Sequence, residues 1–202
     1  MWVILVMMLL GEAPLARAES GLATLMSPAF LKRVVEGREI LTRAEKTELA
    51  GAPLPPDGPG SVQSFAHSSQ MYVRAPLDRA MRFLTDYPGY KSITPYLVRV
   101  EYSAPDGLIA FEGKIWSYPL GGVLRVERKG PRWLRFTVLQ GHSAGLIEDV
   151  FLEGIASEGT LIYVQGGFRV GTWVPVFLVE RAYRTLVGMG LEKIRERIEA
   201  AR

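Results

Sequence analysis

The chain contains no cysteine among its 202 residues. This absence excludes disulfide bonds, thiolate nucleophiles and cysteine-based metal sites. Only two histidines are present, His67 and His142, and neither has another metal-ligating residue at helical or strand spacing, so we predict no metal site and no cofactor. Phosphate-binding loops are also missing: Gly121-Gly122 and Gly166-Gly167 lack the surrounding motif, and we expect strand bulges or bends there.

Long runs of one charge sign are absent as well. The 24 Lys and Arg residues are interspersed with 21 Asp and Glu residues, which gives a formal net charge of +3. A chain without a basic run gives little support to nucleic-acid binding, so we predict no nucleic-acid partner. The mild positive excess is still compatible with transient contact with an anionic membrane.

Long apolar runs are limited to the N-terminus. Residues Trp2 to Leu10 are unbroken apolar, and Ala16-Arg17-Ala18 follows after a short polar stretch. This is the pattern of a cleavable signal peptide, and the run is too short to span a bilayer comfortably. No Lys or Arg precedes the run, so an uncleaved anchor and a start codon further upstream stay open as alternatives. We predict a signal peptide over residues 1–18 and a periplasmic or secreted protein.

The composition of the whole chain is that of one globular domain, with 48% apolar and 22% charged residues. Residues 19–60 are predicted to be a lead-in segment, helical over 25–41 by its apolar spacing. Residues 38–49 fit either a continuation of that helix or a polar edge strand. A Pro/Gly-rich connector follows over 51–60, and the main domain is predicted over 61–202.

The main domain reads as one strand, two short helices, six strands and a long helix. The first strand covers 63–74, a helix opens at Pro76-Leu77, and a break at 86–90 separates it from a short second helix. Short turns rich in Gly, Pro and Asp divide the six strands and predict an antiparallel meander over 97–103, 107–116, 121–129, 132–140, 145–155 and 159–170. Apolar residues recur at helical spacing over 174–201.

One stretch carries a resemblance. Residues 72–90 read as a strand end, then Ala75-Pro76, then a helix ending in Leu-Thr-Asp-Tyr, and a proline precedes the next strand over 94–100. This stretch and the order of elements over 62–201 resemble the START-like superfamily, which includes polyketide cyclase/dehydrase-like proteins and coenzyme-Q-binding chaperones. The resemblance implies an α+β helix-grip fold, a curved antiparallel sheet wrapped around the long C-terminal helix, with an apolar pocket between them. It does not imply one function.

Strand alternation puts apolar side chains of neighbouring strands on a common face, which becomes either packed core or pocket wall. The resemblance favours a pocket, and pockets of this kind are mostly apolar with a few polar groups that orient the ligand. The ligand-binding residues predicted on this basis are Ile109, Phe111, Ile115, Phe136, Tyr163, Gln165, Tyr183 and Val187, among which the two tyrosines and the glutamine would supply the polar groups.

Two adjacent acids are the remaining candidates for chemistry. Glu148 and Asp149 point to opposite faces if they lie on a strand, so only one of them can face a cavity. An inward carboxylate would be a candidate base with a raised pKa, and the alternative is a solvated or arginine-paired acid. For His67 and His142 we expect a surface or hydrogen-bonding role, and we predict no catalytic set.

These observations predict an exported carrier for a hydrophobic ligand, a lipid, a sterol-like molecule or a quinone. One alternative is a cyclase or aromatase-type enzyme that uses Glu148 or Asp149 together with a tyrosine. The other is an interaction module whose lead-in segment and basic helix end contact a protein partner or a membrane.

Overall fold

The computed structural model describes residue 22 and residues 26–47, 61–93, 96–115, 118–141, 144–155, 159–172 and 175–201. The predicted signal peptide, the connector over 51–60 and His142 lie outside these ranges, and so does the side chain of Ile115.

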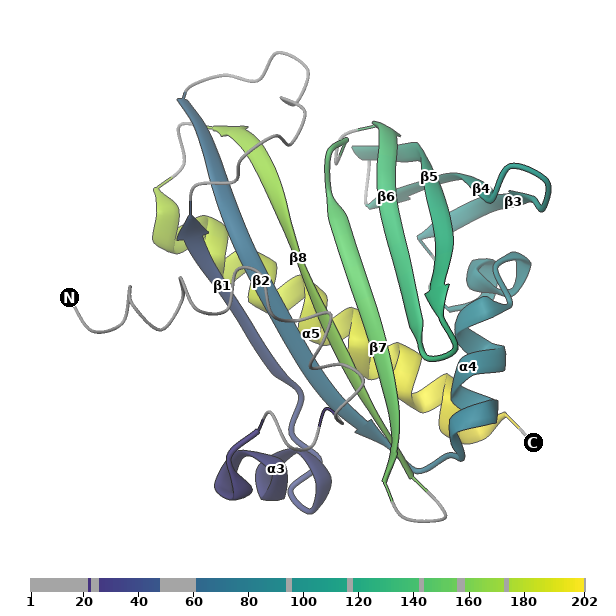
Figure 1. Cartoon of the computed structure of the whole chain (residues 1–202). Helices are drawn as coiled ribbons and strands as arrows, with labels where there is room; N and C mark the ends of the chain where they lie inside the picture. The colour runs from purple at the N-terminus through teal and green to yellow at the C-terminus, as the bar shows by residue number, and fades with distance from the viewer. Residues whose placement is uncertain are drawn as a thin grey trace.

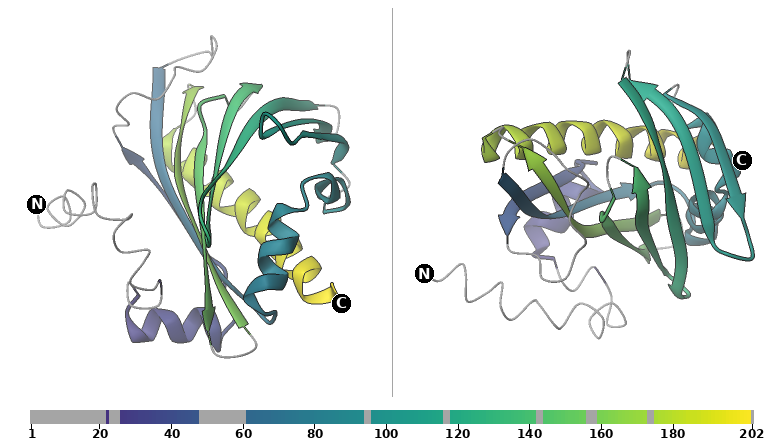
Figure 2. Two further views of the ribbon diagram at one scale, coloured as in Figure 1. Left: turned by 45° about the vertical axis from the view of Figure 1, so that its right-hand side comes forward. Right: turned by 90° about the horizontal axis from the view of Figure 1, so that it is seen from above.

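The fold is a curved antiparallel sheet of eight strands in the order β1-β2-β8-β7-β6-β5-β4-β3, with one long helix, α5, across one face (Figures 1 and 2). This α+β architecture confirms the helix-grip prediction. The strands are β1 Leu41–Thr47, β2 Ser61–Val73, β3 Leu97–Ser103, β4 Leu108–Ile115, β5 Tyr118–Gly130, β6 Trp133–Gly141, β7 Ile147–Ile155 and β8 Gly159–Thr172. The helices are α3 Pro28–Val35, α4 Leu77–Thr85, the 3-10 helix η2 Pro88–Ser92 and α5 Val176–Ala200.

The lead-in segment adds a strand to the sheet. Residues 41–47 form β1, which pairs with β2 from Leu41 opposite Gln70 to Thr47 opposite Ser64, so the edge-strand alternative holds in place of a continued helix. The preceding helix α3 begins after Ser27, whose hydroxyl accepts a hydrogen bond from the Phe30 N–H at 3.3 Å. Residues 26–47 are therefore packed onto the same sheet as the main domain.

The C-terminal helix α5 is fixed to the rest of the chain at its last turns. Glu199 accepts hydrogen bonds from the Arg38 guanidinium and from the Arg74 N–H, each at 2.8 Å, and Arg197 donates to the Ser92 carbonyl at 2.8 Å. Gly188 and Gly190 lie within α5 and have open space where a side chain would start, so neither marks a close contact between the helix and the sheet. None of the helices in the described ranges has the length and apolar character needed to cross a membrane.

The sheet has an inner face, turned toward α5, and an outer face, turned away from it. On the inner face, β2, β6, β7, β8 and α4 pack against the C-terminal half of α5; the fully buried centre of this inner core includes Met71, Leu134, Leu152, Ile162 and Ile198. On the outer face, an outer core of Leu22, Val34, Phe151 and Leu161 lies beneath α3. A third cluster, of Tyr87, Ile109 and Val126, closes the β4–β5 end of the inner face. Both faces are therefore covered over part of the sheet.

Candidate functional site

A row of residues crosses the middle of the inner face. His67 on β2 lies opposite Gly166 on β8, Gly166 lies opposite Glu148 on β7, and Glu148 lies opposite Phe136 on β6. Residues directly opposite one another in an antiparallel pair project to the same face. The pairing of β2, β8 and β7 thus brings the His67 Nε2 atom to 3.9 Å from Glu148 Oε1.

Gly166 makes this approach possible because it places no side chain between the two. A Cβ atom at this position would lie 2.8 Å from His67 Nε2 and 1.9 Å from the carbonyl oxygen of Ile147. Both distances are shorter than side chains tolerate, so the close juxtaposition depends on glycine here. The register is regular on both sides of Gly166-Gly167, and the strand bulge expected there is absent from β8.

His67 is buried without a hydrogen-bond partner. Its side chain has no exposed surface, and within the described ranges neither ring nitrogen is hydrogen-bonded. Burial lowers the pKa of His67 from 6.5 to about 4, so the ring is neutral near neutral pH and offers one N–H donor and one acceptor. His67 therefore does not lie on the surface, and the hydrogen-bonding role expected for it stays a prediction.

Glu148 is enclosed by protein and still reached by solvent. Its side chain is 31% exposed, while burial raises the pKa of its carboxyl from 4.5 to about 7. It makes no hydrogen bond to any residue in the described part of the chain. Solvent contact at an enclosed carboxyl means that side chains do not fill the space beside it. Near neutral pH this group exists in both protonation states, so it can donate as well as accept a proton.

Tyr183 completes the group from the helix side. Its ring lies 4.9 Å from the His67 ring and is stacked at 4.9 Å on Phe168, which in turn stacks at 5.1 Å on Phe65. Its hydroxyl is buried and has no hydrogen-bond partner among the residues described, and burial raises the pKa of Tyr183. The phenol therefore keeps its proton and can donate it to a hydrogen bond.

We call His67, Glu148 and Tyr183 the inner polar group. Buried polar atoms in folded proteins nearly always have a partner, and leaving one without costs about 1–3 kcal/mol. Two such side chains, His67 on β2 and Tyr183 on α5, converge here with the partly exposed Glu148 on β7. Partly buried apolar residues, Phe136, Val164 and Val187, pack beside them at the edge of the inner core. An arrangement of this kind is typical of a ligand site, in which the bound molecule supplies the missing partners.

The other residues predicted to line a pocket divide between the two faces. Ile109 is buried in the third cluster, and Phe111 lies two residues further along β4 on the same face. Phe136 contacts both the inner core and the third cluster, and Val187 packs on the inner core. Of the predicted residues, Tyr183 thus belongs to the inner polar group, Phe136 lies opposite Glu148, and Val187 follows one turn after Tyr183 on α5.

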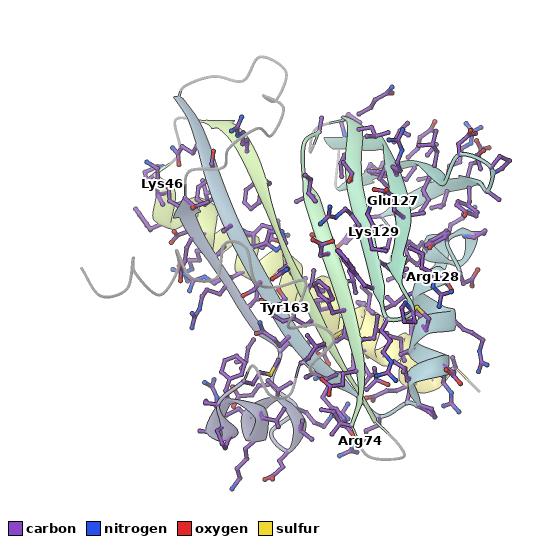
Figure 3. All side chains as sticks on the ribbon, viewed as in Figure 1. Lys46, Arg74, Glu127, Arg128, Lys129 and Tyr163 are labelled. Atoms are coloured by element: carbon purple, nitrogen blue, oxygen red, sulfur yellow. The ribbon has the colours of Figure 1, made fainter. Side chains whose placement is uncertain are left out.

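Tyr163 and Gln165 lie on the outer face, because the even-numbered residues of β8 face α5. Tyr163 packs in the outer core against Phe151 and is hydrogen-bonded to the side chain of Ser68; it is labelled in Figure 3. Gln165 lies opposite Ser68 on one side and Asp149 on the other. Neither side chain is on the face that carries the inner polar group.

Asp149 is also on the outer face and is fully paired. Its carboxylate accepts hydrogen bonds from Arg135 Nε and Nη2, each at 2.8 Å, and from the Trp133 indole N–H at 2.7 Å. The inward carboxylate considered from the sequence is therefore Glu148, and Asp149 is the arginine-paired acid. In the described ranges, no three His, Asp or Glu residues are grouped closely enough to hold a metal ion.

Comparison with known proteins finds the fold but no sequence relative: no family model and no curated protein matches this chain. A START superfamily protein from Mycobacterium smegmatis superposes with a TM-score of 0.58 at 16% identity, over 66% of this chain and 97% of the other. The Zhui aromatase/cyclase from Streptomyces sp. R1128 gives 0.54 at 15% identity, over 69% and 94%. The di-domain ARO/CYC BexL from the BE-7585A biosynthetic pathway gives 0.57 at 16% identity, over 66% and 46%. The chain has the START-like fold, as the resemblance implied.

Proposed function

We propose that this protein is an exported carrier of a hydrophobic small molecule, held between the inner face of the sheet and α5. The observation that carries the proposal is the state of Glu148: an enclosed carboxyl in a largely apolar layer, still open to solvent. The START-like fold supports the same location for a ligand. Export rests on the N-terminal pattern of Trp2 to Leu10 followed by Ala16-Arg17-Ala18.

The surroundings of the inner polar group favour an apolar ligand body. Phe136, Val164, Phe168 and Val187 are all only partly buried, so each has apolar surface left to cover. Each methylene that a ligand buries there contributes about 0.8 kcal/mol to binding. A lipid, a sterol-like molecule or a quinone can therefore bind through apolar contact alone, with the polar group setting its orientation.

Native mass spectrometry tests the carrier function. The mature protein is purified from the exported fraction, anything bound is extracted with organic solvent, and binding of the uncharged dye Nile red is titrated. We expect a stoichiometric co-purifying molecule and saturable dye binding. A Val164→Trp variant fills the inner layer and should lose at least tenfold in dye affinity, whereas Val98→Trp, at a site that is 56% exposed on β3, should not. A clean apo mass together with no dye binding contradicts the carrier function.

A fractionation experiment tests export separately. The full chain should appear in the periplasmic or secreted fraction with residues 1–18 removed, and a chain lacking residues 2–18 should stay in the cytoplasm. Retention of the full chain in the cytoplasm contradicts export and leaves the ligand proposal standing.

A second function, acid–base catalysis of the cyclase or aromatase type, is favoured by one observation. Glu148 has a pKa of about 7, close to the value that serves a general base at neutral pH, and Tyr183 and His67 lie beside it. We expect such an enzyme to accelerate deuterium exchange at the central carbon of benzoylacetone. Glu148→Gln should abolish this exchange and Asp149→Asn should retain it. Unchanged exchange after Glu148→Gln contradicts catalysis by this carboxyl.

A further inference from the structure

We propose that His67, Glu148 and Tyr183 bind the uncharged oxygen, hydroxyl or carbonyl, of a flat ring-bearing ligand, and that they select against carboxylate, phosphate and ammonium head groups. This inference rests on the proposed carrier function and names the chemistry of its ligand.

The spacing of the three side chains suits one shared ligand atom. His67 Nε2 and Glu148 Oε1 are 3.9 Å apart, beyond a normal hydrogen bond, and the His67 and Tyr183 ring centres are 4.9 Å apart. Neither the His67 ring nitrogens nor the Tyr183 hydroxyl are hydrogen-bonded within the described chain, so the groups do not satisfy one another. The 3.9 Å between His67 Nε2 and Glu148 Oε1 suits one oxygen atom that accepts from one of these two groups and, if it is a hydroxyl, donates to the other, with Tyr183 next to the His67 ring.

An anionic head group would find no positive charge here. The His67 ring is neutral, and burial is the cause of the shift at Glu148, with no lysine or arginine of the described chain offsetting it. A carboxylate or phosphate would be desolvated beside an acid without gaining a counter-charge, which is costly in an enclosed site.

An ammonium group is disfavoured for a related reason. Burial holds both His67 and Glu148 toward their neutral forms, so the site opposes charge on its own side chains. A cationic ligand would require Glu148 to ionise and would bury an ion pair whose Coulombic gain is largely offset by desolvation. An uncharged oxygen meets donors and acceptors without any proton being moved.

The shape of the ligand follows from the rings around the polar group. Phe168 stacks on Tyr183 at an interplanar angle of 17° and on Phe65 at 14°, which forms a layered aromatic wall on one side of Glu148. Phe136 lies directly across from Glu148 on the other side. Aromatic side chains on both sides of a polar centre favour a planar ring between them.

Four matched probes test the head-group preference on the mature protein: naphthalene, naphthylmethanol, naphthoate and naphthylmethylamine. They share one ring system and differ in the polar group. At about pH 6, where the carboxylate and ammonium probes are both ionised, we expect naphthylmethanol to bind about tenfold more tightly than naphthalene, as one or two added hydrogen bonds predict. Naphthoate and naphthylmethylamine should bind more weakly than naphthalene.

Variants assign the preference to the inner polar group. Tyr183→Phe and Glu148→Gln should each reduce the advantage of naphthylmethanol over naphthalene about three- to tenfold. Tyr163→Phe, on the outer face, is the matched control and should change none of the four affinities. Tighter binding of naphthoate or naphthylmethylamine overturns the inference. Equal binding of naphthalene and naphthylmethanol overturns it while the carrier function stands, and binding of no probe contradicts the carrier function as well.

Discussion

Glu148 and Asp149 are neighbours in the chain and opposites in their surroundings. Asp149, on the outer face, accepts three hydrogen bonds from Arg135 and Trp133. Glu148, on the inner face, makes none within the described chain and has a pKa raised to about 7 by burial. Two carboxyls at adjacent positions of one strand therefore differ in hydrogen bonding: that of Asp149 is fully hydrogen-bonded, and that of Glu148 has no hydrogen bond within the described chain.

The same contrast extends to the two tyrosines. Tyr163 on the outer face is hydrogen-bonded to Ser68, while the Tyr183 hydroxyl on the inner side is buried without a partner among the residues described. The outer face beneath α3 therefore contributes to stability, and the inner polar group keeps hydrogen-bonding capacity that stability does not use. Unsatisfied polar groups persist in folded proteins mainly where a ligand or a reaction needs them.

The largest difference between the faces should appear when each acid is removed in turn. We expect Asp149→Ala to lower the free energy of unfolding by about 3 kcal/mol, because it leaves Arg135 partly buried and unpaired. Glu148→Gln should lower it by nothing or raise it by about 1 kcal/mol, because it removes a carboxyl whose ionisation is costly. Urea unfolding at neutral pH measures both values. Equal losses in the two variants would contradict the distinction between the faces.

The pH dependence of stability offers a second, smaller test. The depressed pKa of His67 means that stability falls as pH drops from 6.5 to about 4, because the unfolded chain takes up the proton first. The raised pKa of Glu148 means that stability falls as pH rises from 4.5 to about 7, because the unfolded chain loses the proton first. The two slopes oppose each other between pH 4.5 and 6.5. Tyr90 and Tyr183, which also interact with Glu148, keep their protons throughout.

Single variants should uncover each slope relative to the wild-type protein. Glu148→Gln leaves the His67 contribution, so its stability should rise across this window by at most about 1.4 kcal/mol per pH unit relative to wild type. His67→Phe removes the His67 slope and should tilt the other way relative to wild type, by more than Glu148→Gln does, because the removed group is fully buried whereas Glu148 is partly exposed. Urea midpoints at several pH values measure the tilt. Variants that tilt in the same direction would show that the two groups are not both held neutral.

The smallest contrast concerns a single oxygen atom. Tyr183→Phe should stabilise the protein by about 1 kcal/mol because it removes a buried hydroxyl without a partner, and Tyr163→Phe should destabilise it by about 1 kcal/mol because it breaks the bond to Ser68. Thermal unfolding of the two variants side by side compares the signs. A loss of stability in Tyr183→Phe would mean that its hydroxyl is bonded in solution.

Local patterns explain why the order of elements could be predicted. Turn residues such as Pro105-Asp106-Gly107 act over a few positions, and they fix where strands end whatever the rest of the chain does. The predicted strand 132–140 is observed as β6, Trp133–Gly141, and the predicted helix 174–201 as α5, Val176–Ala200. The undecided segment 38–49 needed its partner strand β2 to settle its structure.

The inner polar group could not be derived in the same way. Alternation of apolar and polar residues normally reveals which face of a strand points inward. In β8 both faces are apolar, because α3 covers the outer one. Leu161 and Tyr163 pack in the outer core, while Ile162 and Val164 pack on the inner core. Tyr163 and Gln165 are therefore predicted for the pocket, whereas the structure places both on the outer face. The sequence around His67 does not indicate its place in the site, because its contact with Glu148 depends on two strand pairings between distant parts of the chain.

The pairing of β2 with β8 also has a consequence for the order in which the molecule folds. Strands β3 to β7 lie between these two in the chain and join each neighbour through a short connection, so their hairpins can form early. β2 has to wait until β8 is available, and closing so long a loop slows the step. His67 arrives with β2 and Tyr183 with α5, so the inner polar group is assembled only when the last strand pairing is made. A molecule that binds there acts on the final folding step, and by holding β2, β7 and α5 together it should slow unfolding more than it speeds refolding.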